Sequence, residues 1–240
     1  MVEKTGLDDM DGSKLIDIIS DPAVYHRTLI EGIRQAKASV ILSALYIGTE
    51  KTKEKELIQA IAESLADESR PNLEIALLLD YSRTKRAFAS FEAVFRPLTK
   101  LTRNSHRLHI WLYELLSQRA NQGGIREKLV NCLPPQVKEV LGVYHSKFAV
   151  FDDKTAILTG ANLSEEYFVQ RQDRYYIIRY QQVVKFLSGY AKFLGADSHV
   201  YQHGVLQQPK QNLSNGDVRK GIEKLLEDCM KGDKVGAMGK

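Results

Sequence analysis

A histidine and a lysine, His145 and Lys147, stand two residues apart in the second half of this 240-residue chain. Residues two apart project from the same face of a β-strand. The apolar residues 148–151 that follow are typical of a buried strand, so we expect a strand that opens near residue 143. A histidine and a lysine on one strand face suit a site that handles phosphate groups.

A Gly-Ala-Asn turn, residues 160–162, adds further polar groups a short distance along the chain. Phosphodiester chemistry without a metal ion needs a nucleophile or base that titrates near neutral pH, a cation for the non-bridging oxygens, and further hydrogen-bond donors. His145 suits attack on phosphorus, and Lys147 supplies positive charge. Asn162 and the backbone N–H groups that follow Gly160 supply neutral donors.

Two carboxylates, Asp152 and Asp173, are candidates for holding His145 in the required tautomer by accepting a hydrogen bond from its second ring nitrogen. The alternative is that His145 and Lys147 are exposed on an edge strand beside an ordinary Gly-Asn turn. The H-x-K pair alone would favour that alternative. The added aspartate and the Gly-Ala-Asn turn at their spacing favour the site.

Positive charge is concentrated in one segment, although the net charge is only +4. Residues 83–107 contain seven bases against a single acid, Glu92. Such a segment can meet nucleic acid, an anionic membrane surface or a phosphorylated ligand, or it can form a solvated basic face. The two cysteines, Cys132 and Cys229, form no CxxC motif, so neither a disulfide framework nor a zinc site is indicated.

No apolar run approaches the length of about 18 residues that would suggest a membrane span. The first residues include four acidic side chains and lack the apolar core of a signal peptide. The sequence therefore shows no recognisable targeting signal.

Strand-like and helix-like segments alternate along the chain, which predicts an α/β layered domain. We expect a helix after Asp21-Pro22, a helix near residues 88–95 that ends at Pro97, and a loop with one short helix at 117–140. The expected strands are residues 39–46, 73–79, 107–112, 155–158 and 173–180, besides the strand that opens near 143.

Composition divides the chain into three parts. Residues 1–20 are an N-terminal extension, residues 21–206 form the catalytic lobe, and residues 207–240 are a polar linker, a short helix and a tail expected to be disordered.

The order His145-x-Lys147-x4-Asp152-x6-Thr159-Gly160-x-Asn162 resembles the H-x-K-x4-D-x6-G-S-x-N signature of the phospholipase D superfamily. In this chain threonine stands where the signature has glycine, and glycine where it has serine. The lost serine hydroxyl would remove one phosphate donor. The resemblance implies a phospholipase D-like mixed sheet flanked by helices in a single lobe.

One branch of that superfamily is matched more closely. Residues 160–175, 43–49 and 79–83 resemble segments of the eukaryotic phosphatidylglycerophosphate synthase family. That resemblance covers roughly the N-terminal half of such an enzyme. It implies mitochondrial localisation, which the N-terminus of this chain does not support by itself.

The resemblance implies a reaction in two steps that requires no metal or other cofactor. A histidine attacks the phosphorus of CDP-diacylglycerol and releases CMP, and the hydroxyl of glycerol 3-phosphate then attacks the phosphatidyl-histidine. His145 would be the nucleophile or its acid/base partner, and Lys147 and Asn162 would hold phosphate oxygens. Asp152 would support the site, and Asp173 would be a second acid near His145.

Further substrate contacts are expected from two turns that follow strands. Residues 43–49, with Ser43, Tyr46 and Gly48, enter a helix whose free N–H groups suit a phosphate or nucleotide. Arg83 after the next strand could face glycerol 3-phosphate or lipid head groups, and peripheral contact with an anionic membrane is expected. An ordinary strand–helix turn is the alternative for residues 43–49.

Because the chain contains a single H-x-K motif, a second half or a second copy would have to complete the site. Two alternatives stay open. One is a single-motif phosphodiesterase or nuclease that acts as a homodimer, although nucleic acid is the less favoured substrate. The other is an inactive, truncated half-enzyme.

Overall fold

A computed structural model describes residues 15–100, 106–115, 142–211 and 213–231. The loop predicted at 117–140 and the tail predicted after residue 231 lie outside these residues.

Nine strands of the described residues form one mixed sheet in the order β1-β7-β6-β5-β2-β3-β4-β8-β9. At its centre β2 (Ser39–Ala44), β3 (Glu74–Asp80) and β4 (Leu108–Tyr113) are parallel. Strands β2 and β3 are almost continuously apolar because helices cover both faces of the sheet. The predicted mixed α/β fold is confirmed.

The remaining strands are antiparallel to their neighbours. They are β5 (Phe148–Phe151), β6 (Thr155–Leu158), β7 (Tyr175–Ile178) and β1 (Ile16–Ile19) on one side, and β8 (His199–Gln202) and β9 (Val205–Gln207) on the other. Strand β1 comes from the predicted N-terminal extension, and β9 crosses the predicted boundary at 206. The division into three parts stays a prediction.

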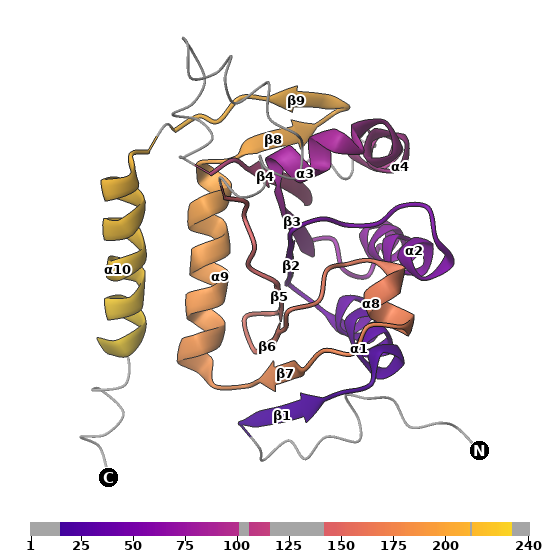
Figure 1. Cartoon of the computed structure of the whole chain (residues 1–240), viewed down its shortest axis with the longest axis horizontal. Helices are drawn as coiled ribbons and strands as arrows, with labels where there is room; N and C mark the ends of the chain where they lie inside the picture. Colours follow the sequence, from indigo (N-terminus) through magenta and orange to yellow (C-terminus); the bar gives the residue numbers. More distant parts are fainter. Residues whose placement is uncertain (1–14, 101–105, 116–141, 212, 232–240) are drawn as a thin grey trace.

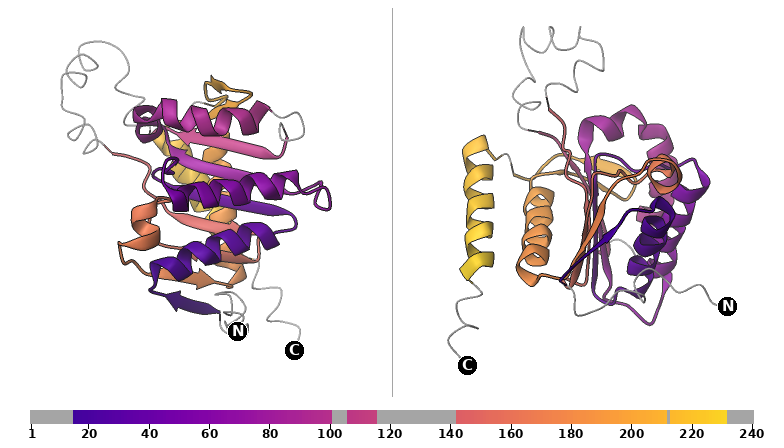
Figure 2. Two further views of the ribbon diagram at one scale, coloured as in Figure 1. Left: turned by 90° about the vertical axis from the view of Figure 1, so that its right-hand side faces the viewer. Right: turned by 60° about the horizontal axis from the view of Figure 1, so that its bottom comes forward.

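Helices form a layer on each face of the sheet (Figures 1 and 2). One face carries α1 (Pro22–Gln35), α2 (Thr52–Ala66), α3 (Tyr81–Arg86), α4 (Phe88–Lys100) and α8 (Glu165–Val169). On the other face α9 (Gln181–Ala196) lies against the sheet, and α10 (Asn215–Lys231) lies outside α9. Two apolar cores result, one on each face.

Two of the differences from the predicted bounds have a clear physical reason. Helix α4 continues through Pro97 to Lys100, because its buried side, formed by Phe91 and Phe95 before the proline, extends to Thr99 after it. Strand β5 begins only at Phe148, since its partner β2 ends one residue past the pairing of Ser43 with Phe148. The H-x-K pair therefore lies in the segment that leads into β5.

Candidate functional site

The strand topology brings the predicted site segments to one edge of the sheet. Strand β5 is antiparallel to both β2 and β6, so the start of β5 lies beside the ends of those two strands. The end of β3 lies at the same edge because β2 and β3 are parallel. The segments that follow β2, β3 and β6 therefore meet the segment that precedes β5.

His145 and Lys147 are in direct contact at this edge. Lys147 Nζ lies 3.0 Å from His145 Nδ1 and donates to the carbonyl oxygen of His145 at 2.9 Å. His145 is exposed, whereas Lys147 is buried. The ammonium of Lys147 can only donate hydrogen bonds, so Nδ1 is the acceptor. The neutral imidazole therefore carries its proton on Nε2.

Partial burial shifts both groups toward their neutral forms, and the charge of Lys147 adds to the shift of His145. The pKa of His145 is lowered, first by burial and then by the charge of Lys147, while Asp80 opposes the shift. Burial lowers the pKa of Lys147 to about 8, and Asp173 opposes that shift. The pair thus combines a neutral imidazole with an ammonium whose charge is lost in mildly alkaline solution.

Asp173 and Gly160 lie against each other beside Lys147. A Cβ at Gly160 would lie 2.6 Å from Asp173 Oδ2, so only glycine permits this approach. The carboxylate also interacts electrostatically with Lys147. The role of Asp173 as hydrogen-bond acceptor for His145 stays a prediction.

Asn162 is buried where β2 ends, and its Oδ1 accepts a hydrogen bond from Leu45 N–H at 3.3 Å. Thr159 N–H donates to Lys147 O at 3.2 Å, which ties the turn to the H-x-K segment. The N–H of Ala161 donates to Thr159 Oγ1. It is therefore not available to a phosphate group, contrary to the expectation for the N–H groups that follow Gly160.

The structure does not bring Asp152 to the site. Strand β5 separates Asp152 from Lys147, and the carboxylate accepts hydrogen bonds from the N–H groups of Lys37, Ala38 and Ser39 at 2.7 to 3.0 Å. Asp152 has a φ of 53°, and these bonds hold it in that left-handed turn. The hypothesis that Asp152 orients His145 is therefore wrong. The two residues lie at opposite ends of β5, and their spacing in the sequence did not show this.

Ser43 is buried, and its hydroxyl contacts the H-x-K segment. Its Oγ lies 2.6 Å from the hydroxyl of Tyr144 and donates to Ser146 O at 3.1 Å. The expected substrate contact of Ser43 is therefore replaced by contacts on both sides of His145.

Asp80 is a residue that the sequence analysis missed. Its fully buried carboxylate accepts from Tyr144 N–H at 2.8 Å through Oδ2, and from Arg83 N–H at 2.7 Å and Ser82 Oγ at 2.6 Å through Oδ1. Burial raises its pKa, against the effect of these hydrogen bonds. An acid at the end of a buried strand was the signal that could have identified it.

The N–H groups at the start of α2 are occupied by carboxylates, which overturns the expectation that they hold a phosphate. Glu54 accepts from Glu50 and Lys51 through Oε2, and from Glu165 at the start of α8 through Oε1. Gly48 N–H donates to the carbonyl of Leu163 at 2.8 Å. The carboxylate of Glu54 fits there only because residue 48 is a glycine. A Cβ at this position would lie 2.0 Å from Glu54 Oε1.

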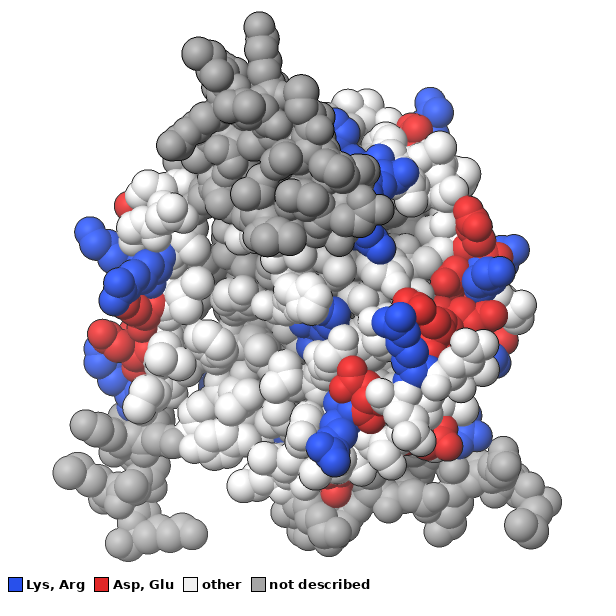
Figure 3. Space-filling view, in the orientation of Figure 1, with Lys and Arg blue, Asp and Glu red and all other residues white. Residues whose placement is uncertain are grey.

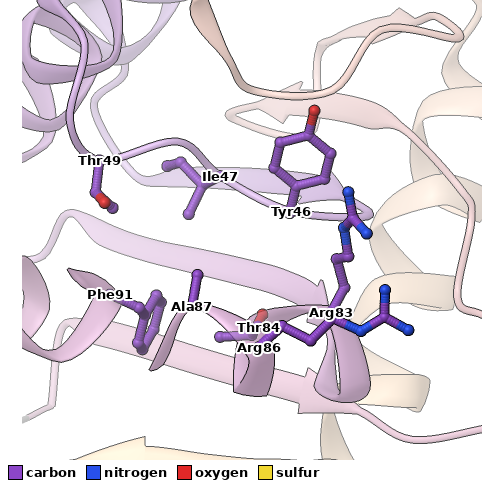
Figure 4. A pocket seen from close by; sticks show the side chains of 8 residues that line it. All are labelled: Tyr46, Ile47, Thr49, Arg83, Thr84, Arg86, Ala87 and Phe91. Carbon is purple, nitrogen blue, oxygen red and sulfur yellow. The ribbon is translucent and has the colours of Figure 1, made fainter. Parts of the chain in front are cut away.

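A pocket of about 320 Å³ lies between the segment after β2 and helix α3 (Figure 4). We call it the α3 pocket; it is lined by Tyr46, Ile47, Thr49, Arg83, Thr84, Arg86, Ala87 and Phe91. The guanidinium of Arg83 lies 5.3 Å from the centroid of the Tyr46 ring. The hydroxyl of Tyr46 donates to Glu166 Oε1 at 2.9 Å, so it is the ring that faces the pocket.

The described residues contain no group of three or more His, Cys, Asp or Glu side chains that could hold a metal ion. The expectation of chemistry without a cofactor stays a prediction. Among the helices of the described residues, none combines the length and apolar character needed to cross a bilayer.

Solved structures of two proteins share the fold. Phosphatidylserine synthase from Haemophilus influenzae Rd KW20 matches with a TM-score of 0.59 at 20% identity, over 89% of this chain and 43% of that one. Nuc from Salmonella typhimurium, a phospholipase D family member, matches with a TM-score of 0.53 at 12% identity, over 78% of this chain and 99% of that one. At these identities the likeness establishes a phospholipase D-like fold.

The family model described as "Cardiolipin synthase, PLD-like domain" matches residues 29–192. The chain therefore belongs to this family of phospholipase D-like domains, as its motif predicted.

Curated relatives carry the name CDP-diacylglycerol–glycerol-3-phosphate 3-phosphatidyltransferase. A probable enzyme of this name from Dictyostelium discoideum is 38% identical over 165 residues, which are 68% of this chain and 26% of that protein. The mitochondrial enzyme from Gallus gallus is 35% identical over 70% of this chain and 29% of its own length, and the one from Saccharomyces cerevisiae is 33% identical over 70% and 30%. The chain thus spans less than a third of these relatives.

Proposed function

We propose that this chain carries one half of the active site of a phosphatidyltransferase that moves a phosphatidyl group from CDP-diacylglycerol to glycerol 3-phosphate. The observation that carries the proposal is the contact of 3.0 Å between His145 and Lys147 in a domain of this family. The names of the relatives supply the two substrates.

In the first step a nitrogen of His145 attacks phosphorus, an N–P bond forms, and the P–O bond to CMP breaks. Attack through Nε2 requires the imidazole proton to lie on Nδ1. Lys147, which donates to Nδ1 in the structure, would then turn to a phosphate oxygen, and Asp173 is the nearby carboxylate proposed to accept from Nδ1–H. In the second step the hydroxyl of glycerol 3-phosphate attacks, an O–P bond forms, and the N–P bond breaks.

Each step also needs a proton donor or acceptor opposite His145, since CMP must be protonated as it leaves and the attacking hydroxyl deprotonated. We propose that a second H-x-K half or a second copy of the chain supplies it. The basic segment around α3 and α4 is proposed to contact an anionic membrane surface, and the relatives favour mitochondrial localisation.

The test is to incubate the chain with CDP-diacylglycerol and glycerol 3-phosphate, and separately with single-stranded DNA, and to measure CMP release, DNA cleavage and sedimentation. We expect CMP and phosphatidylglycerophosphate from an assembled form, and no turnover from His145→Ala. Cleavage of DNA instead would favour the phosphodiesterase alternative. A strict monomer without turnover would refute both activities for this chain, and residual activity near wild type in His145→Ala would refute the nucleophile assignment.

A further inference from the structure

We propose that the α3 pocket binds the phosphate group of a small polar phosphate ester. Under the proposed function, on which the identity of the ester rests, this is either glycerol 3-phosphate or the cytidine nucleotide released as CMP. The pocket is distinct from the His145–Lys147 pair, so it would hold a part of a substrate that does not itself react with His145.

Two arginines give the pocket its charge. Figure 4 shows the guanidinium of Arg83 next to the ring of Tyr46, and the guanidinium of Arg86 on the same side of the pocket but farther from that ring. The planar fork of a guanidinium matches two oxygens of a phosphate group. Lys and Arg side chains also gather over α3 and α4 in Figure 3, so the approach to the pocket is attractive for anions.

The hydroxyl of Thr84 supplies an independent sign of a ligand. Thr84 lines the pocket and is only 5% exposed, and its buried Oγ1 has no hydrogen-bond partner among the described residues. A buried hydroxyl without a partner is unfavourable and uncommon in folded proteins. A phosphate oxygen in the pocket would accept this hydrogen bond.

The size and walls of the pocket limit what accompanies the phosphate. Its volume of about 320 Å³ lies at the small end of the range of ligand pockets, roughly 300–1,000 Å³. Ile47, Ala87 and Phe91 form apolar walls that suit a carbon skeleton or a base. Two acyl chains would not fit, so the pocket suits a polar substrate rather than the lipid tails.

Asp80 connects the pocket to the reaction site. One carboxylate oxygen accepts from Arg83 N–H in the wall of the pocket, and the other accepts from Tyr144 N–H next to His145. The pocket and the nucleophile are therefore held by a single buried group, which fits a substrate that spans both.

The experiment is calorimetric titration of the 240-residue chain with glycerol 3-phosphate, CMP and inorganic phosphate, with glycerol and cytidine as analogues that lack phosphate. We expect at least one ester to bind and its analogue without phosphate not to bind. Arg86→Gln should weaken that binding about tenfold or more, whereas Lys85→Gln, which removes an exposed charge from the same helix outside the pocket, should change it less than about twofold.

Thr84→Val keeps the volume of the side chain and removes the hydroxyl. It should weaken ester binding about fivefold without lowering the melting temperature of the free chain, because the hydroxyl has no hydrogen-bond partner to lose in the part of the chain that the structure describes. Weakened binding of glycerol 3-phosphate alone would assign the pocket to the acceptor, and weakened binding of CMP alone would assign it to the nucleotide.

The proposal is overturned if no ester binds at millimolar concentration, or if Arg86→Gln and Lys85→Gln have equal effects. His145→Ala separates it from the proposed function, because that variant should bind the ester as wild type does. Ester binding that depends on Arg86 in a chain without any CMP release would refute phosphatidyl transfer by this chain alone, while the proposal for the pocket would still hold.

Discussion

The charge of Lys147 influences the protonation of His145, because it disfavours the imidazolium form. Because burial and the neighbouring ammonium both disfavour the imidazolium, we expect His145 to titrate below the ordinary histidine pKa of about 6.5. Lys147→Met removes the charge and should raise the pKa of His145. NMR titration of the imidazole C–H signals, assigned with His145→Ala, measures the pKa of His145 in the wild-type chain and in Lys147→Met.

Lys154→Met is the matched control, because Lys154 is exposed in the turn between β5 and β6. It should leave the titration of His145 unchanged, and an equally unchanged titration in Lys147→Met would contradict the electrostatic argument. In turnover, the lowered pKa keeps the proposed nucleophile neutral into mildly acidic solution. Lys147→Met should lower turnover, and the acid limb of the turnover that remains should move to higher pH.

The alkaline limb should report Lys147. Since its pKa lies at about 8, its charge is present below that pH and is lost as the pH rises through it. We expect turnover of the assembled enzyme to fall above pH 8 as the phosphate oxygens lose their cation. A pH profile that stays flat from pH 7 to pH 10 would show that Lys147 is not needed in its charged form.

Asp80 acts at the residue scale on the backbone beside His145. Asparagine at this position would turn its amide N–H₂ toward the N–H of either Arg83 or Tyr144, and two donors cannot form a hydrogen bond. Asp80→Asn should therefore lower the free energy of unfolding by about 1–3 kcal/mol. Denaturant unfolding measures the loss. Asp21→Asn is the control, because Asp21 caps α1 through Oδ1 alone and asparagine caps a helix as well as aspartate; equal losses in the two variants would contradict this account.

At the scale of elements, Glu54 joins the starts of α2 and α8 and thereby fixes the turn that carries Tyr46. Gly48→Ala would force Glu54 away from three backbone donors, so we expect a loss of about 2–4 kcal/mol in denaturant unfolding. Gly216→Ala in α10 meets only Ser214 Oγ at 3.6 Å and should be neutral or stabilising. A neutral Gly48→Ala would show that the carboxylate is not held there.

At the scale of the whole molecule, α10 forms an outer layer on α9. It has no buried residue, and it contacts α9 through Leu225 against Gly189 and Gly221 against the ring of Phe193. A chain that ends at residue 210 should therefore keep the sheet and lose about 1–3 kcal/mol of stability. Circular dichroism and denaturant unfolding test this, and a chain that no longer unfolds cooperatively would contradict it and the proposed boundary near 207.

Much of the candidate site was predictable because its signals are local. The H-x-K spacing identified His145 and Lys147, and the apolar run of residues 148–151 predicted the buried strand that follows them. Alternating strand and helix patterns predicted the α/β fold. The type and order of residues were sufficient here, since chemistry and periodicity are read along the chain.

Only the tertiary structure decided which polar groups share the site. It placed Asp152 at the far end of β5, where three backbone donors hold it, and it brought Asp80 from β3 to the backbone beside His145. It also gave the N–H groups before α2 to Glu54. These partners are distant in sequence, and the pairing of strands, which no local pattern encodes, determines which strand ends meet.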